Sequence, residues 1–125
     1  MAFLGSFFRD LSRTPEETRA DNLRDWTATI RGAVPIAELK PRERAKVAGV
    51  IQNIRIDPRE GSGSIEATII DGTGQMVARW LGRDRMPGIG LGMGLLIEGM
   101  CGVGDEGELV ILNPEYDLVA DPETG

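Results

Sequence analysis

Residues 64–81 have the sequence SIEATIIDGTGQMVARWL. Apolar residues alternate with other residues on both sides of DGTG at 71–74, and a period of two is typical of half-buried strands. An Asp-Gly pair between two such runs is a strong hairpin signal, because glycine tolerates the positive φ of a tight turn. The pattern predicts a β-hairpin. Its inward-facing side chains would be Ile65, Ala67, Ile69, Met76, Ala78 and Trp80.

Strand patterns continue on both sides of the hairpin. A run rich in β-branched residues spans 46–56 and contains Gly49, and a glycine inside a strand predicts a bulge or a bend. Further strands are expected at 95–103 and 108–112, separated by the turn sequence GDEG. The segments 57–63 and 82–94 contain prolines and several glycines, so they are expected to be connections. The sequence thus predicts five strands.

The residues before the strands predict helical structure. Thr14, Pro15 and Glu17 form a capping box, which starts a helix that ends near Arg31. The apolar face of this helix would carry Leu23, Trp26, Thr27 and Ile30. A second apolar stripe at helical spacing precedes it. This stripe consists of Phe3, Leu4, Phe7, Phe8 and Leu11. Two interpretations stay open: the stripes dock on the sheet or on each other, or the phenylalanines bind a partner or a membrane surface.

Composition narrows the class of protein. A chain of 125 residues with 41% hydrophobic residues is expected to form one folded domain. The single cysteine, Cys101, excludes an internal disulfide and favours the reducing cytoplasm. It lies in a predicted strand, where we expect it to be buried as a small apolar side chain. The sequence shows no signal-peptide pattern and no apolar run as long as a membrane span.

The residue types argue against catalysis. The chain has no histidine, so the commonest general base is absent, and so are Cys/His pairs and the usual zinc clusters. Asp71 is explained as a turn residue that bonds its own backbone two residues further on. The glycine run at 88–94 does not match the spacing of a dinucleotide-binding loop. We therefore expect no enzyme activity, no cofactor and no metal site.

Five strands in this order, with the longest connection between the third and the fourth, resemble the OB-fold. The resemblance covers residues 35–116. It is carried by VAGVI at 47–51, DGTG at 71–74, the glycines at 94 and 99, and NPEY at 113–116. NPEY resembles the wedge domain of the RecG helicase, and PIAEL at 35–39 resembles small stand-alone OB proteins of actinobacteria. The anticodon-binding OB domains of tRNA synthetases are also similar.

The resemblance implies an all-β architecture with attachments at both ends. A five-stranded Greek-key barrel would occupy residues 35–116. A helical extension at 1–34 would precede it, and an acidic flexible tail at 117–125 would follow it.

The same resemblance implies a non-catalytic protein that binds nucleic acid. OB-folds hold single strands on the outer face of their second and third strands and on the adjoining loops. Trp80 is either a core residue or a platform for base stacking. Arg79, Arg83 and Arg85 are expected to carry most of the phosphate affinity, unless one of them is an ion-pair partner of Asp84 or Glu66. The full set of candidate residues is Lys46, Gln52, Arg55, Arg59, Arg79, Trp80, Arg83 and Arg85.

Charge predicts that any such binding is weak and sensitive to salt. The net charge of −6 has the wrong sign for a strong, non-specific polyanion binder. Glu66 shares a face with Arg79 and would repel phosphate, and the turn at 104–107 is acidic. The ligand would be single-stranded DNA, single-stranded RNA or a junction. The alternative is a protein-interaction module that docks through its N-terminal helix.

Overall fold

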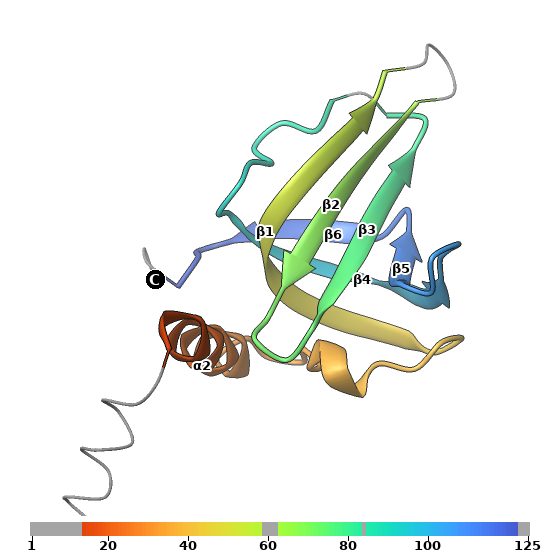
Figure 1. Cartoon of the computed structure of the whole chain (residues 1–125). Coiled ribbons are helices and arrows are strands. Elements are labelled where there is room, and N and C mark those ends of the chain that lie inside the picture. Colours follow the sequence, from red (N-terminus) through yellow and green to blue (C-terminus); the bar gives the residue numbers. More distant parts are fainter. Residues whose placement is uncertain (1–13, 59–62, 84, 123–125) are drawn as a thin grey trace, which may run out of the picture.

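The structure is a computed structural model that describes residues 14–58, 63–83 and 85–122 (Figure 1). Its elements in chain order are α2 (Pro15–Ala28), the 3-10 turn η1 (Ile36–Glu38), β1 (Arg44–Asp57), β2 (Ser64–Ile70), β3 (Gln75–Leu81), β4 (Gly94–Val103), β5 (Leu109–Leu112) and β6 (Glu115–Val119). The predicted stripe at residues 3–11 lies outside the described residues. No helix within the described ranges is long and apolar enough to cross a membrane.

The strands form one sheet that closes on itself. Their order is β1-β2-β3-β5-β4-β6, and β1 also pairs with β4. The β3–β5 pair is parallel, and the other pairs are antiparallel. Residues 44–50 of β1 pair with β4, whereas residues 50–57 pair with β2. One long strand therefore belongs to both halves of the ring, as the OB-fold prediction required.

Gly49 lies where β1 passes from one partner strand to the other. A Cβ atom at this position would lie 2.9 Å from the Cβ of Ile69 and 3.0 Å from the carbonyl oxygen of Ile70. Only glycine permits so close an approach of the two strands. The bulge itself follows a little later, between Ile51 and Asn53, where Gln52 is the additional residue of β1.

Gly49→Ala should lower the free energy of unfolding by about 1–3 kcal/mol, because the added methyl group overlaps packed atoms of β2. Gly102→Ala is a matched control in β4. Its Cβ atom would meet nothing closer than the Val110 carbonyl oxygen at 3.7 Å, so its stability should be unchanged or slightly higher. Urea denaturation of both variants measures the difference. Equal stability of the two variants would contradict the steric role of Gly49.

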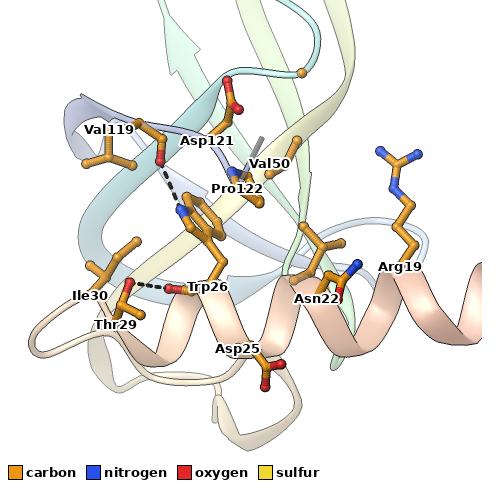
Figure 2. A pocket seen from close by; sticks show the side chains of 13 residues that line it. Arg19, Asn22, Asp25, Trp26, Thr29, Ile30, Val50, Val119, Asp121 and Pro122 are labelled. Atoms are coloured by element: carbon orange, nitrogen blue, oxygen red, sulfur yellow. Dashed lines mark hydrogen bonds between the residues drawn. The ribbon is translucent and has the colours of Figure 1, made fainter. Parts of the chain in front are cut away.

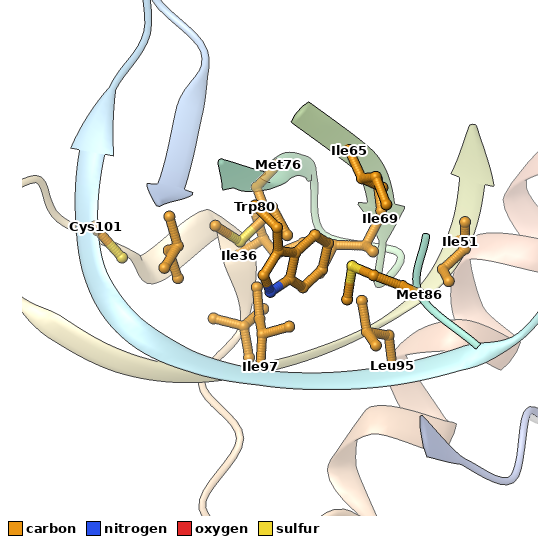
Figure 3. Close-up of a cluster of buried hydrophobic side chains, with 14 residues drawn as sticks. Ile36, Ile51, Ile65, Ile69, Met76, Trp80, Met86, Leu95, Ile97 and Cys101 are labelled. Carbon is orange, nitrogen blue, oxygen red and sulfur yellow. The ribbon is translucent and has the colours of Figure 1, made fainter. Parts of the chain in front are cut away.

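Trp80 lies at the centre of the core inside the ring (Figure 3). Its indole is 2% exposed, and its Nε1–H donates to the carbonyl oxygen of Pro114 at 3.0 Å. The ring meets Tyr116 edge to face, with 5.5 Å between the ring centroids. All six side chains predicted to face inward from the hairpin are buried. The predicted register of the hairpin is therefore confirmed.

Cys101 is buried, as predicted. Burial raises the pKa of its thiol above the usual value, and the Glu43 carboxylate raises it further. The thiolate form is therefore disfavoured at neutral pH, which makes this cysteine a poor nucleophile.

The C-terminal part of the chain corrects one prediction. The sequence predicts a flexible tail at 117–125, but residues 117–119 belong to β6, which pairs with β4. Asn113, with a φ of +49°, separates β5 from β6. Its side-chain oxygen accepts from the Leu81 amide, and its own amide donates to the Arg79 carbonyl oxygen. The acidic side chains of Glu115 and Asp117 are exposed, whereas Tyr116 between them packs on Trp80. The acidic residues therefore lie on the outer side of a strand and do not indicate a flexible tail.

Helix α2 packs on the outside of the sheet, near β1 and the β2–β3 turn (Figure 1). It begins as predicted, with the Thr14 hydroxyl accepting from the Glu17 amide at 3.1 Å. Leu23 is its buried residue. Arg24 donates to the carbonyl oxygen of Gly72, which fixes the helix to the hairpin turn.

Candidate nucleic-acid interface

The outer face of β2 and β3 carries a row of side chains that crosses four strands. Arg55 of β1 lies opposite Glu66 of β2, Glu66 lies opposite Arg79 of β3, and Arg79 pairs in register with Leu112 of β5. In the next row, Asn53, Thr68 and Val77 are register partners. Figure 1 shows α2 beside the turn that joins β2 to β3, which forms one end of this face.

Arg79 forms an ion pair with Glu66 within this row. Its Nε atom donates to Glu66 Oε1 at 2.6 Å, and its Nη2 atom lies 2.5 Å from the same oxygen. The two side chains are 34% and 21% exposed, so water screens the pair only in part. The charge of Arg79 is therefore largely balanced. The outward position predicted for Arg79 is correct, but this side chain is not a free cation.

Three further predicted arginines and a glutamine are exposed. Because β1 and β3 are both antiparallel to β2, they run in the same direction, and their C-terminal ends lie at the same end of the ring. Arg55 lies near the end of β1, and Arg83 and Arg85 follow the end of β3. The structure thus brings these three cations to the same end of the ring. Gln52 is exposed at the bulge of β1.

Two of the predicted site residues that the structure describes do not join this group. Trp80 was included as a possible stacking platform, but its ring faces the core, so it cannot stack on a base. Lys46 lies on the part of β1 that pairs with β4, opposite Glu98, nine residues before Arg55. The two halves of the bent strand belong to different sides of the ring, which separates Lys46 from Arg79. Arg59 lies outside the described residues.

Two leucines beside Arg79 were not assigned to the site from the sequence. Leu112 is 54% exposed and Leu81 is 52% exposed, and they flank the ion pair on β5 and β3. The alternation of the hairpin already placed Leu81 outward. Leu112 could not be placed, because it reaches this face through the parallel β3–β5 pairing, which carries no local sequence signal.

The acidic turn at 104–107 is folded on itself. The Gly104 amide donates to the Glu108 carbonyl oxygen, and the Glu108 carboxylate accepts from the Glu106 amide at 3.3 Å. The turn presents Asp105 and Glu106 to solvent. A phosphate backbone would be repelled there.

Comparison with known proteins gives matches at the level of structure. No protein-family model matches the chain, and no curated protein matches it. The structure of RecG bound to a three-way DNA junction is similar, with a TM-score of 0.55 and 17% identity over 68% of this chain. The match spans only 12% of the RecG chain.

A replication protein A heterotrimer bound to single-stranded DNA is also similar. The TM-score is 0.50 with 17% identity, and the match covers 74% of this chain and 70% of that chain. Likeness at this level of identity concerns the fold, and it agrees with the closed strand order described above. The chain therefore has an OB-fold.

Proposed function

We propose that this protein binds single-stranded or junction nucleic acid, weakly and without catalysis, through the outer face of β2 and β3. The observation that carries the proposal is that Arg55, Arg83 and Arg85 are exposed at the end of the ring where β1 and β3 end, next to that face. The OB-folds of similar structure support it, since one was solved with a three-way DNA junction and the other with single-stranded DNA.

The side chains on this face determine the affinity for nucleic acid that we expect. Stacking on an aromatic ring contributes about 1–3 kcal/mol per base in single-strand binding sites. The two barrel aromatics that could supply it, Trp80 and Tyr116, pack on each other instead. Leu81 and Leu112 offer apolar contact without stacking, and Glu66 neutralises Arg79. Binding should therefore depend mainly on the three exposed arginines and should weaken strongly as salt is added.

Replacing Arg55, Arg83 and Arg85 together by alanine should lower the salt slope of binding by about 2 on a single-stranded ligand, at about 0.7 per phosphate contact. Fluorescence anisotropy with a labelled DNA oligonucleotide, from low to physiological salt, measures the slope. All three side chains are exposed. The melting temperature should therefore stay nearly unchanged.

A matched variant removes the same charge elsewhere. Arg19, Arg31 and Lys40 are exposed and lie before β1. Alanine at these three positions should leave most of the slope intact. Equal salt slopes of binding for the two triple variants would contradict the assigned face. The salt dependence would then reflect only the net charge of the whole protein.

The choice of probes tests the ligand class. Single-stranded DNA, single-stranded RNA and a three-way DNA junction are titrated under identical conditions. The proposal expects measurable binding of at least one probe at low salt. Absence of binding to all three would overturn it and favour the protein-interaction module.

A further inference from the structure

A groove of about 750 Å³ separates α2 from the segment that follows β6 (Figure 2). Figure 2 shows Trp26 projecting from α2 toward this segment, and its Nε1–H donates to the carbonyl oxygen of Ala120 at 2.9 Å. The apolar side chains that line the groove are Leu23, Trp26, Ile30, Val50, Val119 and Pro122.

The walls of this groove are only partly covered. Trp26, Ile30 and Val119 are each half-buried, whereas Leu23 and Val50 at its base are buried. Apolar grooves of this kind, formed between a helix and a sheet edge, are places where a further segment can pack. A segment with several large apolar side chains would fit.

We propose that residues 3–11 of the same chain occupy this groove and place Phe7 and Phe8 against Trp26 and Ile30. This stretch contains three phenylalanines and two leucines at helical spacing. The proposal is independent of nucleic-acid binding. It assigns the apolar stripe to an intramolecular site on α2.

The point where the segment joins the described structure supports this occupant. Residue 14 is the N-cap of α2, so residues 1–13 connect directly to the helix that forms one wall. Leu23 and Trp26 lie about 13 and 18 Å from Thr14 along the helix axis, at about 1.5 Å per residue. Nine residues span about 13 Å as a helix and about 30 Å when extended. Phe7 precedes Thr14 by seven residues, which span about 10 Å as a helix and about 23 Å when extended. The connection must therefore be largely extended for Phe7 and Phe8 to reach Trp26, and in that form it is long enough.

Charge and covalent linkage also favour residues 3–11 as the occupant of the groove. The charged residues lining the groove are Asp25, Asp121 and Arg19, which leaves one negative charge in excess. Residues 1–13 contain Arg9 and Arg13 against a single acidic residue, Asp10. A covalently linked segment also reaches an effective concentration in the mM range, which a separate molecule seldom matches.

Nuclear Overhauser effects in the full chain test the proposal. With labelled isoleucine and valine methyl groups, the phenylalanine rings should show contacts to the methyls of Ile30, Val50 and Val119. Replacing Phe7 and Phe8 by serine should abolish these contacts and shift the Ile30 and Val119 methyl signals. The signals of Ile97, inside the core, should stay in place.

Two controls make the result decisive. Val103→Ser removes an exposed apolar side chain from the end of β4 and should leave the groove signals unchanged. In a mixture of labelled and unlabelled protein, filtered spectra separate contacts within one molecule from contacts between two. Contacts only between molecules would assign the groove to a second copy, and unchanged spectra in the double serine variant would leave the groove without this occupant. Either result overturns the proposal.

Discussion

Trp80→Ala is expected to lower the free energy of unfolding by about 3–5 kcal/mol, the range for removing a large aromatic side chain from a core. The indole is almost fully buried at the centre of the ring and packs on Tyr116 of β6. The substitution also leaves the Pro114 carbonyl oxygen without its donor. Because Pro114 lies between β5 and β6, the loss would affect both the core and the corner that holds β6.

Urea denaturation followed by far-ultraviolet circular dichroism measures this effect without relying on the tryptophan that is removed. Trp80→Phe keeps much of the apolar volume but removes the hydrogen bond. Its free energy of unfolding should therefore fall clearly less than that of Trp80→Ala. Trp26→Ala is the matched control on α2, where the indole is only half-buried. A loss below about 1 kcal/mol in Trp80→Ala, within the range of surface substitutions, would contradict the core assignment.

The hairpin at 64–81 was predictable because its information is local. Alternation fixed which side chains face inward, and DGTG fixed the turn. The bond from the Thr73 amide to Asp71 Oδ1, at 2.8 Å, is the predicted contact two residues further on. The capping of α2 by Thr14 was predictable for the same reason.

Features that depend on distant strands were not predictable from local sequence. The sequence predicts residues 117–119 of β6 as part of an acidic tail, because they carry no strand signal of their own, and their pairing with β4 orders them. Lys46 and Arg55 belong to one strand, but the change of partner at residue 50 places them in different parts of the ring. The spacing of these two residues along the chain does not reveal that their side chains lie on different sides of the ring.

The candidate site shows the same division. The sequence placed Glu66 and Arg79 on one face, and it left open whether Glu66 repels phosphate or pairs with an arginine. The structure places the two residues directly opposite each other with hydrogen-bond contact. Arg79→Ala alone is therefore a poor test of phosphate binding, because it also exposes an unpaired carboxylate. This is why the proposed triple variant spares Arg79.

Asp71 is the buried charged residue that connects two parts of the described chain far apart in sequence. It is 1% exposed. Its Oδ1 atom accepts from the Thr73 amide, the Thr73 hydroxyl and the Gly74 amide at 2.7–3.1 Å. Its Oδ2 atom accepts from the Ile36 amide at 2.8 Å. One carboxylate thus closes the hairpin turn and also fixes η1, which precedes β1.

Asp71→Ala should lower the free energy of unfolding by about 3 kcal/mol or more. Each buried donor that loses its partner contributes about 1–3 kcal/mol, and the Ile36 amide is such a donor. Asp71→Asn should have an intermediate effect. Its amide oxygen can still accept from the turn, but its NH₂ group would then face the Ile36 amide, a second donor.

Hydrogen exchange can separate the two roles of Asp71. In Asp71→Asn the amide of Ile36 should exchange much faster, whereas the amide of Val77 in β3 should keep most of its protection. Asp105→Ala serves as the matched control, because Asp105 is exposed in the β4–β5 turn. If Asp71→Ala proves as stable as Asp105→Ala, the hydrogen bonds of Asp71 are not what holds η1. The apolar contact of Ile36 with the core and the hydrogen bond from the Ala37 amide to the Thr73 hydroxyl would then be sufficient.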